Sequence, residues 1–223
     1  MLEKYFGFTD IHDEYSVLDS LLEHTRIDEE ELILLVRMLG GLCNKDDHII
    51  KDYYDKILKI NTDSSKVFET VAEQIIQSNF NHQKQYDLIR TYQRINDISA
   101  MISVVAKSIL ILSKVGVLNK HFHKVLLEMG QQIIDIHKEF YNALTQYQAD
   151  KHLVIKTIHR ILESDDKIKQ ISSNSIEVLY DLANKDELKL GDFRATEHIF
   201  EGLEKLSFSV KEAGTSLEWM LIY

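Results

Sequence analysis

Apolar residues recur every three to four positions along most of this chain, which is the period of an α-helix with one buried face. Six stretches show this pattern, separated by short polar or glycine-containing segments. The first expected helix runs from about Glu14 to Leu42 and closes near Asn44. Asp46 or Asp47 can cap the N-terminus of the second, whose apolar stripe extends to Ile75.

The third expected helix, from about Gln85 to Lys114, is the most apolar. Within it, the segment from Ile95 to Leu118 resembles a membrane span, but Asp97, Lys107 and Lys114 interrupt it. A span needs roughly 20 apolar residues with few charges. We therefore expect a soluble protein in which this helix is buried on several sides by its neighbours.

Three further stripes follow Gly116, at 122–147, 154–182 and 193–221. Helices of about 30 residues are about 45 Å long, and short polar turns between them favour antiparallel packing. Two sets of three similar lengths suggest an internal duplication. The prediction is an all-α fold of six long antiparallel helices in two sets of three, residues 1–116 and 117–223.

Composition supports this prediction and narrows the functional class. The chain of 223 residues has no proline and only eight glycines, which argues against β-sandwiches and barrels. Its net charge of −10 argues against nucleic acid as a partner. Cys43 is the single cysteine, so no internal disulfide forms, and the N-terminal segment has no secretory pattern. These features predict a cytoplasmic protein.

Enzymatic motifs are absent from the sequence. It has no glycine-rich phosphate loop, no HExxH or ExxH pair, and too few cysteines for a thiolate zinc site or an iron–sulfur cluster. Carboxylates at helical spacing remain: Glu197, Glu201 and Glu204 form one stripe, and Asp135 and Glu139 form an i,i+4 pair. Such pairs of carboxylates can bind a hard cation that bridges their oxygens.

Short segments of four expected helices carry a family resemblance: most clearly RTYQRINDI at 90–98 and the segment 199–214 of the last helix, and more weakly 59–63 and 162–168. They resemble segments of the PhoU-like family of phosphate-transport regulators. The resemblance implies tandem three-helix bundles and a repeated E(D)xxxD motif, whose paired carboxylates clasp metal ions.

The chain departs from that motif at each of the four positions. The first acid of the motif corresponds to Lys59, Gln93, Leu162 and Glu204, and the second to Asp63, Asp97, Asp166 and Phe208. No pair keeps both carboxylates, so we expect a reduced or absent metal site and no required cofactor. The candidate ligands for weakly bound Fe, Zn, Mg or Mn are Asp63, Asp97, Asp166, Glu201 and Glu204.

The resemblance implies a non-enzymatic regulator that binds a membrane phosphate permease or a phosphate-signalling protein at the inner face of the membrane. An acidic protein is suited to the Lys- and Arg-rich cytoplasmic loops of membrane proteins. Two alternatives stay open. One is a metal-binding protein whose ligands are Glu197, Glu201, Glu204 and Asp97, and the other is a helical scaffold or homo-oligomerisation module.

Overall fold

The computed structural model describes residues 8–222, and side chains from residue 15 to residue 221. The first seven residues, part of the N-terminal segment that shows no secretory pattern, lie outside this range. All the expected helices are present, and the described residues contain no strand. The helices are α1 (Phe8–Asn44), α2 (Asp47–Gln77), α3 (His82–Val115), α4 (His123–Gln146), α5 (Lys151–Asn184) and α6 (Leu190–Ile222), with a short 3-10 turn η2 (Lys120–Phe122) before α4.

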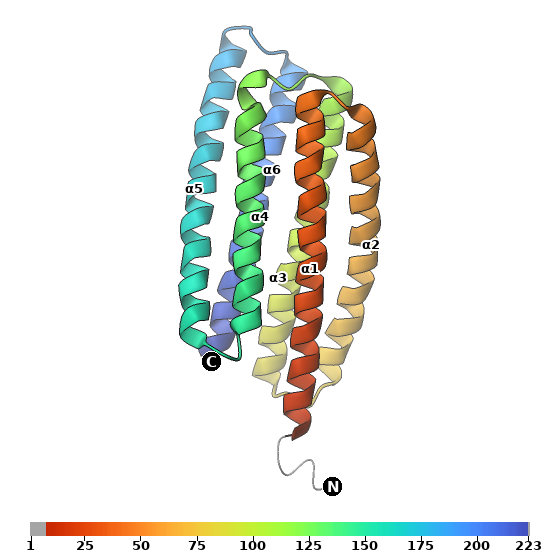
Figure 1. Cartoon of the computed structure of the whole chain (residues 1–223), viewed down its shortest axis with the longest axis vertical. Helices are drawn as coiled ribbons and strands as arrows, with labels where there is room; N and C mark the ends of the chain where they lie inside the picture. Colours follow the sequence, from red (N-terminus) through yellow and green to blue (C-terminus); the bar gives the residue numbers. More distant parts are fainter. Residues whose placement is uncertain (1–7, 223) are drawn as a thin grey trace.

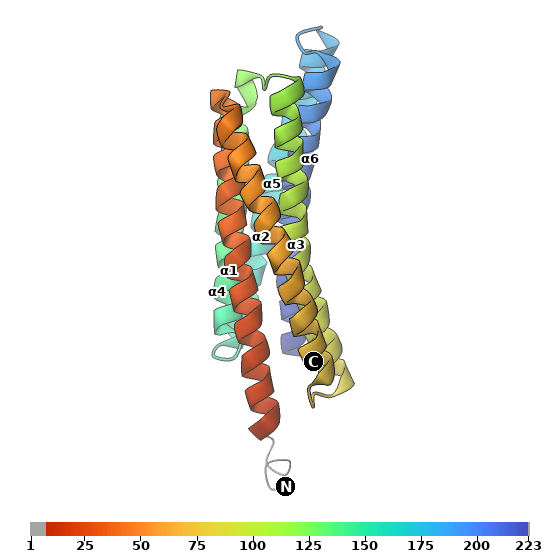
Figure 2. The same cartoon turned by 90° about the vertical axis from the view of Figure 1, so that its right-hand side faces the viewer.

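The helices alternate in direction along one long axis (Figure 1). In each half of the chain, every helix packs on the other two, which confirms the two tandem three-helix bundles. The halves meet along α3 and α6 and along α1 and α4. Consequently α1, α3, α4 and α6 form the centre of the molecule, while α2 and α5 flank it (Figures 1 and 2).

Side-chain caps fix several of the helix starts. Asp46, one of the two expected caps of α2, accepts a hydrogen bond from the backbone N–H of Ile49 at 3.0 Å. Asn81 caps α3 and Asp150 caps α5 in the same way. Each cap satisfies one of the backbone donors that a helix leaves free at its N-terminus, so the turns of this proline-free chain are set by short polar residues.

Two glycines allow the halves to approach closely. A Cβ atom on Gly202 of α6 would lie 2.9 Å from Cγ2 of Val105 on α3. A Cβ atom on Gly130 of α4 would lie equally close to Cγ2 of Val36 on α1, at 2.9 Å. Both interfaces between the halves therefore depend on a residue without a side chain.

The apolar helix α3 packs against α1, α2 and α6, as expected of a helix within a bundle. It is also the one described helix that is long and apolar enough to cross a membrane by length and composition alone. In its most apolar window, 44% of the residues are buried. Val104, Ile111 and Val115 remain exposed on its outer face.

Candidate functional site

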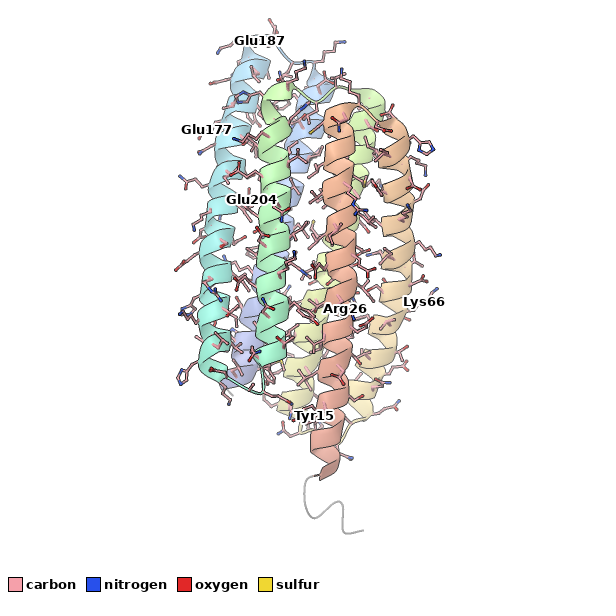
Figure 3. The ribbon with its side chains drawn as sticks, in the orientation of Figure 1. Tyr15, Arg26, Lys66, Glu177, Glu187 and Glu204 are labelled. Carbon is pink, nitrogen blue, oxygen red and sulfur yellow. The ribbon has the colours of Figure 1, made fainter. Side chains whose placement is uncertain are left out.

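Three of the predicted metal ligands lie on three different helices. Asp63 is exposed on α2, where it pairs with Lys66 at 3.3 Å on the outer side of the helix (Figure 3). Asp166 is exposed on α5, and half-buried Asp97 on α3 lies 3.4 Å from Arg94. Within residues 15–221, no group of three His, Cys, Asp or Glu side chains is placed to hold a metal ion.

The remaining predicted ligands lie on α6, in the acidic stripe. Glu201 is partly exposed and faces Lys205 at 3.9 Å, and Glu204 is half-buried. Glu197, the third acid of the stripe, is buried, and its two oxygens accept hydrogen bonds from Tyr180 and Arg194, both at 2.9 Å. The stripe is therefore not a continuous acidic surface. The five predicted ligands stay predictions.

The second acidic pair of the sequence lines a groove between α4 and α5. Asp135 and Glu139 lie on its α4 side, and Arg160, Glu163 and Lys167 lie on its α5 side, around a volume of about 460 Å³. Arg160 pairs with Glu139 at 3.0 Å. Two basic side chains therefore offset most of the charge of the acids in this groove.

A different set of polar residues is buried inside the first three-helix bundle. His24, Asp28 and Glu31 on α1 are all 0% exposed. Their spacing of four and three residues places them on one face of the helix. With their partners on α2 and α3 they form what we call the buried polar cluster: His24, Asp28, Glu31, Asn61, Ser64, Tyr92 and Ser99.

Both ring nitrogens of His24 are engaged. Nδ1 lies 3.1 Å from the hydroxyl oxygen of Tyr92, and Nε2 lies 2.6 Å from that of Ser64. Burial lowers the pKa of His24 to about 4, so the ring is neutral near pH 7. A neutral imidazole donates at one nitrogen and accepts at the other, which fixes the orientations of the two hydroxyls.

Glu31 has one partnered and one unpartnered oxygen. The hydroxyl of Ser99 donates to Oε2 of Glu31, and the side-chain amide of Asn61 donates to the Ser99 oxygen at 2.8 Å. Oε1 of Glu31 has no hydrogen-bond partner. Burial raises the pKa of Glu31 to about 8, although the hydrogen bond from Ser99 acts in the opposite direction.

Asp28 is more isolated than Glu31. Both of its carboxylate oxygens are buried without a hydrogen-bond partner, and the nearest basic atom, Nε2 of His24, is 3.9 Å away. Burial, followed by repulsion from Glu31, raises the pKa of Asp28 well above its ordinary value. The cluster thus contains three carboxylate oxygens that receive no donor.

In the second three-helix bundle, a buried carboxylate has a basic partner. Asp165 on α5 accepts a hydrogen bond from Ser207 at 2.7 Å and an ion pair from Lys211 at 3.2 Å, both on α6. Its charge is therefore balanced by a lysine of the same bundle, whereas no lysine or arginine of the described chain forms an ion pair with Asp28 or Glu31.

The buried polar cluster was not predicted from the sequence, although a signal was present. The apolar stripe of the first helix is interrupted between Leu22 and Leu32. The polar residues in that gap follow the same helical spacing as the apolar residues on either side of it. Consequently Leu21, His24, Asp28, Glu31 and Leu35 all lie in the core.

Comparison with known proteins identifies the fold. No protein-family profile and no curated protein sequence matches the chain. A PhoU-like protein from Shewanella oneidensis matches its structure with a TM-score of 0.80 and 14% identity, over 92% of this chain and 99% of that one.

Two further solved structures match over almost the whole chain. The phosphate transport system regulatory protein PhoU from Streptococcus pneumoniae gives a TM-score of 0.73 at 16% identity, over 95% of this chain and 96% of that one. PhoU from Pseudomonas aeruginosa gives 0.73 at 12% identity, over 95% and 98%. The chain therefore has the PhoU-like fold that the sequence resemblance implied.

Proposed function

We propose that the protein regulates inorganic phosphate transport by binding a protein partner, without catalysing a reaction. The observation that carries this proposal is the extent of the structural match. PhoU from Streptococcus pneumoniae, described as a regulatory protein of the phosphate transport system, aligns over 96% of its own length. A fold shared from end to end supports a shared mode of action by analogy with that protein.

The partner of this proposal is a phosphate permease or a phosphate-signalling protein with a basic cytoplasmic surface. The chain carries a net charge of −10, and cytoplasmic loops of membrane proteins are enriched in Lys and Arg. Complementary charge increases the association rate and suppresses wrong partners. The protein would therefore act in the cytoplasm, at the inner face of the membrane.

The outer face of α1 is the first surface to test. Asp19, Glu23 and Glu30 are exposed there, and the one exposed arginine beside them, Arg26, pairs with Glu23 at 3.5 Å. Exposed Asp52 on α2 differs because a lysine balances it, with Lys56 at 2.7 Å. The two faces thus compare three acids that a single arginine offsets only in part with an acid that a lysine balances.

The test is affinity purification of the tagged protein from its own source cells, grown with abundant and with scarce phosphate, followed by mass spectrometry. We expect a phosphate permease or phosphate-signalling protein whose recovery changes with phosphate and falls as salt increases. Reversing the charge of Asp19, Glu23 and Glu30 to Lys should reduce this recovery, whereas Asp52→Lys should not. Absence of any such partner in both conditions, with gentle detergent, would refute the proposal.

A further inference from the structure

The outer face of α3 carries an exposed apolar stripe. Its side chains Val104, Ile111 and Val115 are 54%, 45% and 64% exposed. Their spacing of seven and four residues places them above one another on one side of the helix. The helices α1, α2 and α6 pack on the other sides of α3, and the stripe stays open to solvent.

Two lysines border the apolar stripe. With 3.6 residues per turn, Lys107 and Lys114 lie above one another along one edge of it. Both are exposed, and neither forms an ion pair with any residue between 15 and 221. On α2, by contrast, Lys56 pairs with Asp52 at 2.7 Å. The charges next to the stripe are therefore available to an anion outside the molecule.

The stripe belongs to a part of the chain without acids. Residues 98–127 contain four lysines and no aspartate or glutamate, although the whole chain has 36 acidic residues and a net charge of −10. At the end of α3, Asp192 accepts a hydrogen bond from the backbone N–H of Val117 at 3.1 Å, and Asp47 shares a groove with Lys45. The outer face of α3 is thus basic and apolar, on a protein that is acidic as a whole.

The acids of the flanking helices do not change the sign of this surface. On α2, the exposed acid Asp55 pairs with Lys51. On α6, Glu201 faces Lys205 at 3.9 Å. Each of these acids is balanced by a lysine of its own helix, whereas the lysines of α3 have no acid to balance.

The acidic face of α1 lies on the opposite side of the molecule. Figure 2 shows α1 and α4 together on one side and α3 and α6 on the other. Two layers of helices place the outer faces of α1 and α3 about 20 Å apart, whereas charges are screened over about 8 Å at physiological salt. The negative net charge therefore does not prevent the outer face of α3 from attracting an anionic surface.

We infer that the outer face of α3 binds the surface of a membrane that contains anionic lipids. The apolar stripe would enter the boundary between headgroups and acyl chains, and Lys107 and Lys114 would contact the phosphates of the headgroups. Interfacial helices combine an apolar face with basic residues in this way. A short apolar stripe and two lysines are each weak, and together they give reversible binding. The inference goes beyond the proposed regulatory function, because it needs no protein partner.

The composition of this face favours lipid over protein. Residues 98–117 contain no arginine and no aromatic residue. Both types are enriched in protein–protein interfaces, whereas lysine is depleted there. Lysine is a flexible point charge, which suits lipid phosphates that have no fixed arrangement.

The experiment is flotation of the full chain with vesicles, at low and at physiological salt. One set of vesicles contains phosphatidylcholine alone, and the other contains phosphatidylcholine and anionic phosphatidylglycerol. We expect the protein to float with the anionic vesicles, less so as salt increases, and to float poorly with the neutral vesicles.

Two double variants test the two parts of the surface. Lys107→Gln with Lys114→Gln should reduce binding to the anionic vesicles roughly thirtyfold, because each lysine near an anionic membrane contributes about fivefold. Ile111→Ser with Val115→Ser should reduce it roughly tenfold through the lost apolar contact. All four side chains are exposed, and circular dichroism checks that both variants fold.

The matched control removes the same charge elsewhere. Lys56→Gln with Lys138→Gln changes two lysines that pair with Asp52 and Glu29, away from the outer face of α3. This variant has the same net charge as the lysine variant of α3. It should bind the anionic vesicles like the unmodified chain.

Absence of binding to the anionic vesicles at low salt would overturn the inference and would leave a protein as the partner of this face. Equal losses in the control and in the lysine variant of α3 would also overturn it, because net charge alone would then explain the binding. Unchanged binding by the lysine variant would exclude the outer face of α3. Vesicles contain no protein, so these failures do not affect the proposal on phosphate transport, and failure of the affinity purification does not affect this one.

Discussion

The buried carboxyl groups of Asp28 and Glu31 should make the protein less stable as the pH rises from about 7 to about 8.5. The unfolded chain exposes Asp28 and Glu31, whose pKa values are then about 4, so both are ionised over this range. In the folded chain Glu31 has a pKa of about 8, and the pKa of Asp28 is raised well above its ordinary value. The folded state therefore binds more protons, and stability falls as these protons are lost.

The magnitude follows from the linkage between protons and folding. Each carboxyl group that is protonated only in the folded state reduces the free energy of unfolding by about 1.4 kcal/mol per pH unit. Over this interval Glu31 contributes a loss of about 1 kcal/mol because it titrates within the interval, and the raised pKa of Asp28 adds to this loss. Even the contribution of Glu31 alone is measurable against a typical stability of roughly 5–15 kcal/mol.

Two buried histidines are the reason that the pH interval of this prediction begins at about 7. The pKa of His24 is lowered to about 4 and that of His137 to about 3, mainly by burial. Unfolded histidine has a pKa of about 6.5, so these residues make stability rise with pH from their folded pKa values to about 6.5. Above about pH 7 both are neutral in both states, and the carboxyl groups dominate.

The assay is urea unfolding at pH 7.0 and 8.5 in the presence of a chelator, followed by circular dichroism. Glu31→Gln should reduce the loss of stability by about 1 kcal/mol, because only Asp28 then retains a raised pKa. Asp63→Asn, which changes an exposed acid, should lose as much stability as the unmodified chain. If the unmodified chain is equally stable at both pH values, or more stable at pH 8.5, the reasoning about the buried carboxyl groups is wrong.

Four substitutions test other parts of the structure, each by urea or thermal unfolding. His137→Leu should stabilise the protein by about 1–3 kcal/mol, because both ring nitrogens of His137 are buried without partners; a loss of stability would contradict this. Gly202→Leu should destabilise it by roughly 1–3 kcal/mol through overpacking between α3 and α6, whereas Gly40→Ala, which has open space around it, should gain up to about 1 kcal/mol. Asp46→Ala should cost about 1 kcal/mol through the lost cap of α2, and an unchanged stability would show that the cap is dispensable.

The periodicity of apolar residues was sufficient to predict the six helices and their order, because each helix buries a stripe along its length. Helix ends were predicted less well. α1 begins at Phe8, where the sequence suggested Glu14, since an apolar stripe marks only the part of a helix that packs. Short polar residues located the helix starts more accurately. Asp46, one of the two caps that the sequence predicted for the second helix, does cap α2.

The candidate site was predictable only in part, because spacing places side chains on a helix face without telling which face is covered. Glu197 and Glu201 share a stripe in the sequence, yet Glu197 is buried against Tyr180 and Glu201 is partly exposed. Asp28 and Glu31 belong to a polar stretch that looks solvated until α2 and α3 pack over it. The difference depends on tertiary contacts, which no local pattern contains.

The pairing of α3 with α6 has a consequence for the synthesis of the chain. α3 ends at residue 115 and α6 begins at residue 190, so about 75 residues must be translated before the partner of α3 starts to emerge. At about 5–20 residues per second, α3, the one described helix apolar enough to cross a membrane, remains without α6 for roughly 4–15 seconds. During that time its uncovered face is a target for chaperones and for aggregation, and slower translation would prolong the exposure.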